Sequence, residues 1–230
     1  MQYPIGSPTC WNESNINCTV HDAQCGYGCV NQSAAEITAM ADYPLMRLSQ
    51  NTNGGSKTPL AESGNTGWMT PAKMGGKFSA TCWFFGRDVF KKLSPPRPLG
   101  LIETNVGGTP DQHWSSPEAI DKCKGAEPWD WPANFTDSVL WNGKVVPLLR
   151  TTIKGAIWYQ GEANSRADGR QYNCSFPAMI EGELLPVPLA ILESTRATLT
   201  CLVASQTGAR SGLRTPRARP TLPFPSAGLS

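Results

Sequence analysis

The sequence predicts a single α/β domain built on a parallel sheet, because short apolar segments alternate with amphipathic segments of helical period. Three segments have the character of strands, at residues 45–49, 99–104 and 153–159. The clearest helix covers residues 77–93, where apolar residues recur at helical spacing. We expect the three strands to be parallel neighbours in one sheet, with this helix packed on one face. The 230 residues are enough for one such domain with a substantial core.

The first helix is predicted to begin at about Ser33, where apolar residues follow at helical spacing and either Asn31 or Ser33 can cap the first turn. Tyr43-Pro44 ends this helix, and the first strand follows directly. Residues 49–76 are rich in Gly, Asn, Ser and Thr, which indicates a loop before the next helix.

Three features define the later helices. The helix at 77–93 is predicted to bury an apolar stripe that consists of Phe78, Cys82, Phe85, Val89 and Leu93. Ser116-Pro117 supplies a capping serine and a proline at the first position of the next helix. A further short helix is expected at residues 172–181, with an interruption at Pro177.

Polar residues follow the apolar strand at 153–159. Gln160, Glu162 and Asn164 would point amide and carboxylate groups beyond the carboxyl end of that strand. In open α/β sheets, the crevice beyond the carboxyl ends of the strands is where ligands bind. Taken alone, the segment is equally a core strand followed by a polar turn.

A second loop of the same form follows the strand at 99–104. It contains the pair Gly107-Gly108, which lets the backbone approach a ligand closely. Backbone N–H groups in such a loop can bind an oxyanion. For the Gly-Gly pair alone, an ordinary turn is the better interpretation.

Together the two loops resemble motifs of the sialate O-acetylesterases, within the wider SGNH-hydrolase group. The motifs are V-G-G-T-P at 106–110, the following Trp114, and W-Y-Q-G-E-A-N at 158–164, with further matches at 78–87, 138–142 and 172–178. The resemblance covers roughly residues 1–181 in the order of the family. It implies a three-layer, flavodoxin-like α/β fold with an incomplete parallel sheet, truncated at both ends.

The resemblance implies hydrolysis of O-acetyl esters of sialic acids by Ser–His acyl transfer, without a metal or another cofactor. The partner would be O-acetylated sialic acid or a sialoglycan. By the resemblance, the backbone N–H of Gly107 or Gly108 and the side chain of Gln160 supply the oxyanion half of the site. Glu162 would orient its loop, and Asn164 would add a hydrogen bond to substrate or backbone.

The catalytic residues of the family are not expected within this chain. The family's serine lies in a G-Q-S-N-M block, and Met1 looks like the end of that block, so the serine would lie two positions earlier. The family's histidine belongs to a late D-x-x-H block, which neither His21 nor His113 fits. No G-x-S-x-G motif occurs. We expect little or no esterase activity; a non-catalytic glycan-binding or pseudoenzyme fragment, or a chain that does not fold stably, are the alternatives.

Secretory features are abundant. Five asparagines lie in N-x-[ST] sequons, more than chance would place there: Asn12, Asn17, Asn31, Asn134 and Asn173. Eight cysteines point to the same history, and four of them crowd residues 10–29, which favours a disulfide-tied loop. A zinc site is the rival, because Cys25 and Cys29 have a permissible spacing. The number of possible pairings leaves the connectivity open.

Residues 1–4 lack the charged and apolar regions of a signal peptide, so we expect the true N-terminus to lie upstream. The family resemblance implies a lysosomal or secreted location. No run of about 18 apolar residues occurs that could span a membrane. The net charge of +2 is too small to indicate a nucleic-acid partner.

Composition changes sharply at about Gly182, which divides the chain into a domain at 1–182 and a tail at 183–230. The tail has no Asn, Asp, Lys, His, Trp, Tyr or Met, and it is rich in Pro, Arg and Ser. The domain carries 15 basic and 16 acidic side chains (net −1), whereas the tail carries five Arg and two Glu (net +3). We expect the tail to be disordered, without regular structure packed on the domain. A proline-rich docking tail is the alternative.

Overall fold

The computed structural model describes residues 5, 30, 32–124, 137–165, 171–184 and 197–203. These residues contain one sheet in the order β1-β2-β4-β3, in which every pairing is parallel. The strands are β1 (Met46–Gln50), β2 (Leu99–Asn105), β3 (Gly155–Tyr159) and β4 (Ala197–Val203). The α-helices are α1 (Ser33–Ala39), α2 (Pro71–Met74), α3 (Ala80–Lys92), α4 (Pro117–Cys123), α5 (Glu162–Ser165) and α6 (Tyr172–Leu184).

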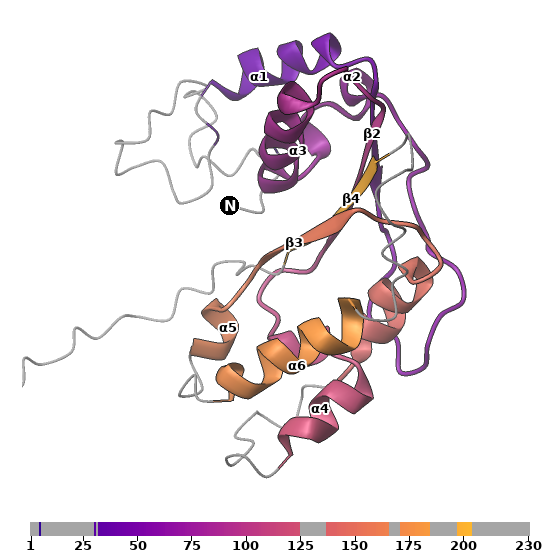
Figure 1. Cartoon of the computed structure of the whole chain (residues 1–230), viewed down its shortest axis with the longest axis vertical. Helices are drawn as coiled ribbons and strands as arrows, with labels where there is room; N and C mark the ends of the chain where they lie inside the picture. The colour runs from indigo at the N-terminus through magenta and orange to yellow at the C-terminus, as the bar shows by residue number, and fades with distance from the viewer. Residues whose placement is uncertain are drawn as a thin grey trace, which may run out of the picture.

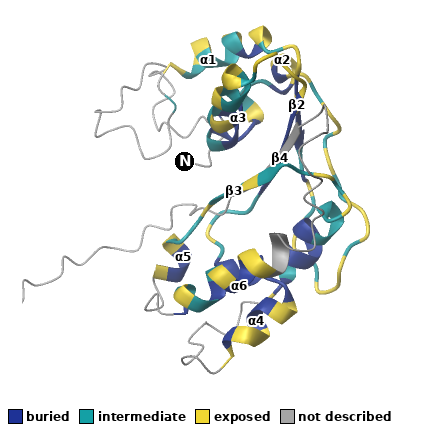
Figure 2. Ribbon diagram, in the orientation of Figure 1, coloured by how far each residue is buried: buried dark blue, intermediate teal, exposed yellow. Residues whose placement is uncertain are grey.

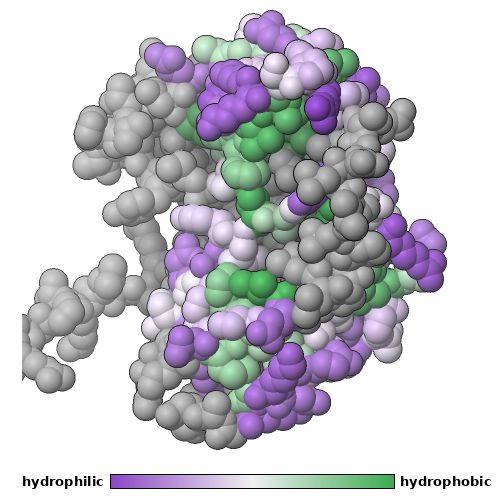
Figure 3. All heavy atoms as spheres, viewed as in Figure 1, coloured by the Kyte–Doolittle hydropathy of each residue, from purple (hydrophilic) through white to green (hydrophobic). Residues whose placement is uncertain are grey.

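Helices cover both sides of the sheet: α1, α2 and α3 lie on one side, and α4, α5 and α6 on the other (Figure 1). Each side has its own apolar core. The first is built around residues such as Leu48, Leu101 and Trp83, and the second around Trp114 and Met179. Figure 2 shows that α3, α4 and α6 each have a buried and an exposed side. In Figure 3, hydrophilic residues cover the outer ends of the molecule, over α1 and α4, and apolar residues gather between them.

The side chains of β3 alternate between the two faces of the sheet, so that this one strand contributes to both cores. Ile157 packs against the first core and the adjacent Trp158 against the second, because successive strand residues point to opposite faces.

Close packing of α3 on β2 depends on a glycine: a Cβ at Gly86 would lie 2.5 Å from a methyl carbon of Leu101. The predicted α/β class with a parallel sheet is therefore confirmed.

The neighbour order of the sheet differs from the prediction. β1 and β2 are neighbours as expected, but β4 lies between β2 and β3 and pairs with both. The expectation that the tail forms no regular structure was therefore wrong for residues 197–203. The prediction was based on the average composition of the Pro- and Arg-rich tail, and it therefore missed this short segment of Thr, Leu and Val, whose composition suits a strand. The other residues of the tail after Leu184 lie outside the described part of the chain, so the boundary near Gly182 stays a prediction.

The prediction for the buried stripe of α3 was correct for Phe78 and Cys82, which are buried, and for Val89, which packs against the first core, but it was wrong for Phe85. Phe85 is 41% exposed, and Trp83 and Gly86 are buried in its place. The helix begins after Ser79, whose hydroxyl accepts a hydrogen bond from the backbone N–H of Cys82, 3.3 Å away. Trp83 packs edge-on against Tyr43 and donates from Nε1 to Glu36 Oε1, and Gly86 lies against Leu101 of β2. These long-range contacts bury Trp83 and Gly86 and leave Phe85 outside.

Three predictions about helix ends had mixed outcomes. Ser116 caps α4 as expected, because its hydroxyl accepts from the N–H of Ala119 at 3.1 Å. Ser33 does not cap α1: Gln32 occupies the cap position with a φ of 54° and makes no side-chain cap bond, and Asn31 lies outside the described residues. The predicted interruption of α6 was also wrong, since the helix continues through Pro177, which is exposed.

In the described part of the chain, no helix has the length and apolar character needed to cross a bilayer.

Candidate functional site

The two loops singled out in the sequence meet at one edge of the sheet. Gly107 follows β2 and Gln160 follows β3, and parallel strands place both loops at their common carboxyl end. The side-chain Nε2 of Gln160 donates to the backbone oxygen of Thr109 at 3.2 Å, which joins the loops directly. The prediction that both loops lie at the same end of the sheet is confirmed.

The Gly-Gly loop is held from its inner side. Thr109 Oγ1 donates to the backbone oxygen of Val106 at 2.9 Å and accepts from Trp114 Nε1 at 3.0 Å. Gly108 has a φ of 73°, a left-handed conformation that side chains other than glycine rarely adopt. The fully buried Trp114 thus anchors the loop, while Gly108 is exposed at the edge.

Gln160 uses its amide inside the site. Its Nε2 donates to Thr109 and also to Asn164 Oδ1 at 2.5 Å, so both amide hydrogens have partners. Its Oε1 is a buried acceptor with no hydrogen-bond partner among the described residues. To donate to an oxyanion, Gln160 would have to break one of these two hydrogen bonds. Its role as an oxyanion donor stays a prediction. Glu162 is exposed at the first position of α5, and its orienting role also stays a prediction.

Asn164 is buried on α5 and bonds to the segment that follows the Gly-Gly loop. Its Oδ1 accepts from the backbone N–H of Asp111 at 3.0 Å. Its Nδ2 donates to Asp111 Oδ1 at 2.5 Å and to Gln112 Oε1 at 3.1 Å. Of the two partners expected for Asn164, substrate or backbone, the described contacts include the backbone.

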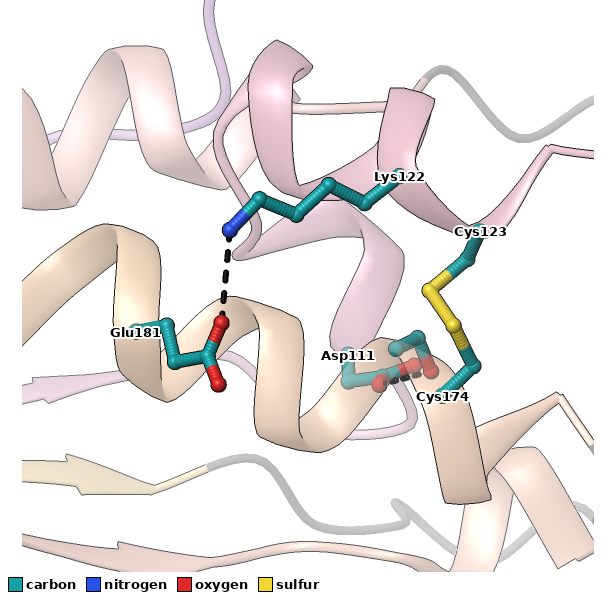
Figure 4. The surroundings of a disulfide bond; sticks show 6 residues. Asp111, Lys122, Cys123, Cys174 and Glu181 are labelled. Atoms are coloured by element: carbon teal, nitrogen blue, oxygen red, sulfur yellow. Dashed lines mark hydrogen bonds and ion pairs between the residues drawn. A yellow bond between two sulfur atoms is a disulfide. The ribbon is translucent and has the colours of Figure 1, made fainter.

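Asp111 belongs to the site although sequence reasoning did not propose it. The residue is 0% exposed, and Ser175 Oγ donates to its Oδ2 at 2.5 Å. Figure 4 shows the carboxylate beside α6. Burial raises the pKa of Asp111 to about 6, although hydrogen bonds from Ser175 and Asn164 lower it. An aspartate after Thr-Pro is typical of an exposed turn, so only its place between two motifs could have indicated burial.

His113 is close in sequence but suits general-base chemistry poorly. It ends the 3₁₀-helix η3 (Asp111–His113) and is 7% exposed. Burial lowers the pKa of His113 to about 4. A general base works best when its pKa lies near the operating pH. The other histidine, His21, lies outside the described residues.

A second polar cluster lies where β1 and β2 end. Glu103 accepts from the backbone N–H of Ser79 at 2.8 Å and from Asn105 Nδ2. Lys144, which is 4% exposed in the π-helix η4 (Trp141–Val145), donates from Nζ to the backbone oxygen of Asn51 at 3.1 Å. Burial raises the pKa of Glu103 and lowers that of Lys144. A single lysine beside an apolar run gave no sign of this burial, which long-range contacts create.

A disulfide bond between Cys123 and Cys174 joins α4 to α6 (Figure 4). Asn173, the last of the predicted sequons, is exposed beside it. The other sequons and the cysteines of residues 10–29 lie outside the described residues: Asn12, Asn17, Asn31, Asn134, Cys10, Cys18, Cys25 and Cys29. The glycosylation, the disulfide-tied loop and its zinc alternative therefore stay predictions.

The fold and the site define an α/β protein in which two polar loops meet at the carboxyl edge of a parallel sheet. Residues 26–183 match the family described as carbohydrate esterase, sialic acid-specific acetylesterase. The match covers more than half of the chain, and the chain belongs to this family. The resemblance seen in the sequence motifs is thereby confirmed.

Relatives with this description come from several mammals. The sialate O-acetylesterase of Pongo abelii is 33% identical over 194 residues, which cover 73% of this chain and 37% of that protein. The sialate O-acetylesterase of Homo sapiens is 44% identical over 108 residues, 45% of this chain and 20% of that protein. The chain thus spans less than two fifths of the length of these relatives.

A solved structure shares the fold. The crystal structure of a carbohydrate acetylesterase from Xanthomonas citri superposes with a TM-score of 0.55 at 21% identity. The shared part covers 73% of this chain and 44% of that chain.

Proposed function

We propose that this chain carries the substrate-binding half of a sialate O-acetylesterase site, which takes O-acetylated sialic acid or a sialoglycan. The proposal includes a three-layer, flavodoxin-like arrangement of the SGNH-hydrolase kind and, for the complete enzyme, Ser–His acyl transfer. Family membership and the two convergent loops support it. The observation that carries it is the hydrogen bond of Gln160 Nε2 to the backbone oxygen of Thr109, which brings both family motifs to one edge.

The chemistry of ester hydrolysis explains why such a loop pair is useful. Attack on the ester carbonyl produces a tetrahedral oxyanion, which N–H donors held in place stabilise. The backbone at Gly107 and Gly108 can come close to such an oxygen, because neither residue has a side chain and Gly108 has a left-handed φ. This supports the oxyanion role that we propose for the loop.

We also propose that this chain by itself releases acetate slowly or not at all. Acyl transfer needs a serine activated by a well-placed base. His113 is buried with a pKa of about 4, so it is a weak base at neutral pH. An oxyanion site without an activated nucleophile stabilises a charge that does not form. We therefore propose that the chain binds the glycan without hydrolysing its acetyl ester.

The test combines binding and turnover on the full chain. We expect a titration with O-acetylated N-acetylneuraminic acid to show saturable binding, and acetate release to stay near the uncatalysed rate. Gly108→Ala should weaken binding at least tenfold. Gly75→Ala is a matched control, since Gly75 has a φ of 57° and open space around it but lies after α2. Absence of binding would refute the substrate proposal, and turnover like that of a complete esterase would refute inactivity.

A lysosomal or secreted location is part of the proposal. The Cys123–Cys174 disulfide supports it, because structural disulfides persist in oxidising compartments. The exposure of Asn173 in its sequon supports it as well. Expression through the secretory route should give a product whose mobility increases after glycosidase treatment; a product without glycans would contradict the proposal.

A further inference from the structure

The buried carboxylate of Asp111 lies where three segments of the site meet. Asp111 itself follows the Gly-Gly loop, Asn164 comes from α5 and Ser175 from α6. Both side chains donate to the carboxylate at 2.5 Å, Asn164 to Oδ1 and Ser175 to Oδ2. The backbone oxygen of Asp111 also accepts from Ser115 Oγ at 2.9 Å. The carboxylate therefore connects segments that are distant in sequence.

These bonds form a closed ring with the candidate oxyanion residue. Asp111 bonds to Asn164, Asn164 Oδ1 accepts from Gln160, and Gln160 donates to the backbone oxygen of Thr109. Thr109 is only two residues before Asp111, so the ring closes through the backbone. The orientation of Asn164 is set by the backbone N–H of Asp111 at its Oδ1, and by the Asp111 carboxylate together with Gln112 Oε1 at its Nδ2. The orientation of Asn164 then decides which way its oxygen faces Gln160.

We propose that Asp111 is a positioning residue of the site, whose carboxylate sets the orientation of Asn164 and, through Asn164, of the Gln160 amide. The proposal rests on the function proposed above for the two loops. Asp111 is fully buried, so it acts through Asn164 and does not touch the substrate. It keeps the Gly-Gly loop and the Gln160 loop in one relative arrangement before a ligand arrives, which spares the ligand that ordering cost.

The titratable neighbours of Asp111 can be told apart. Tyr172 faces it from α6, and burial, more than the charges of Asp111 and Glu162, raises the pKa of Tyr172. Glu162 is exposed on α5. His113, on the same 3₁₀-helix as Asp111, has a pKa of about 4. A change centred near pH 6 therefore matches Asp111 rather than Tyr172 or His113.

The unaltered chain allows a first test by NMR. The side-chain amide resonances of Asn164 and Gln160 should shift with the carboxyl carbon of Asp111, with one midpoint near pH 6. Protonation removes the charge that strengthens the bond from Asn164, and this change should pass along the ring. A Gln160 amide whose resonances do not change between pH 5 and pH 7, while Asp111 titrates, would overturn the proposal.

Variants supply the second test. Asp111→Ala should move the Gln160 amide proton that bonds to Asn164 toward the value of a solvent-exposed amide. Asp111→Asn should keep it near its original position, because the new amide oxygen can still accept from Asn164. Lys122→Met is the matched control, since it breaks the exposed Lys122–Glu181 ion pair between α4 and α6 (Figure 4) and should leave Gln160 unchanged. Equal shifts in all three variants would refute a positioning role. If Asp111→Ala does not fold, the titration of the unaltered chain decides.

A ligand titration separates this proposal from the function on which it rests. Binding of O-acetylated N-acetylneuraminic acid should weaken at least tenfold in Asp111→Ala and less than threefold in Asp111→Asn. If Gln160 responds to Asp111 but no variant, nor the unaltered chain, binds the sugar, the positioning is correct and the proposed substrate is wrong. If the sugar binds equally well to all variants and Gln160 does not respond to Asp111, the positioning proposal is wrong and the substrate stands.

Discussion

Replacement of Asp111 by Asn should make the chain more stable at neutral pH and have progressively less benefit in acid. The carboxylate is fully buried, and the side chains described as donating to it, Asn164 and Ser175, are both uncharged. Burial raises the pKa of Asp111 from 3.8 to about 6. An amide at this position avoids the burial of a negative charge, can still accept from Asn164, and can donate to Ser175 once that hydroxyl rotates.

The magnitude follows from the two pKa values. The pKa in the folded chain is higher than in the unfolded chain, so the native state binds the proton more tightly. The contribution of Asp111 to stability is therefore complete below about pH 4 and is lost as the pH rises through about 6. A shift of roughly two pKa units corresponds to about 3 kcal/mol in the free energy of unfolding.

Urea unfolding of the unaltered chain and of Asp111→Asn at several pH values measures the effect. Between pH 4 and pH 7, the difference in unfolding free energy should change by about 2.5 kcal/mol in favour of the variant, because part of the full effect falls below pH 4. His113 has the opposite sign: its folded-state pKa is lowered from 6.5 to about 4, so it favours folding as the pH rises through that range. The difference between the two proteins is informative because His113 contributes to both.

Two results would contradict this reasoning. Stability curves that run parallel from pH 4 to pH 7 would mean that Asp111 has the same proton affinity in the folded and unfolded chain. A variant that becomes relatively less stable as the pH rises would mean that the ionised carboxylate is favoured by its surroundings, and its pKa would then be lowered.

Three further predictions concern stability. Replacement of Cys123 and Cys174 by Ser should lower the unfolding free energy by about 4 kcal/mol, from the sequence separation of 51 residues, in chemical denaturation at fixed pH; a loss below about 1 kcal/mol would contradict it. Gly143→Ala should cost about 3 kcal/mol or more, because the new Cβ would lie 2.1 Å from the backbone oxygen of Gly54; an unchanged thermal midpoint would refute this close approach. Phe85→Ser should cost only about 1 kcal/mol, because Phe85 is 41% exposed, and a loss of several kcal/mol would mean that Phe85 belongs to the core.

Local patterns in the sequence were enough to predict the elements that carry the site. The sequence patterns predict β1, β2 and β3, the α3 helix, the Ser116 cap and the two polar loops. Each depends on interactions within a few residues: strand and helix periodicity, a cap, or a turn glycine. The alternation of strand and helix segments predicts a parallel sheet, and a parallel sheet places Gly107 and Gln160 at the same edge, as the structure shows.

Tertiary contacts decided the remainder, because they join residues that no local pattern connects. On α3, Trp83 is buried by its contacts with Tyr43 and Glu36, whereas Phe85, equally apolar in sequence, is left 41% exposed. Likewise, β4 becomes a strand by pairing with β2 and β3, within a tail whose average composition argues against structure. The burial of Asp111 arises from α5 and α6, more than fifty residues further along the chain. Local spacing therefore determined which residues reach the edge of the sheet, and long-range packing determined which of them are buried and charged there.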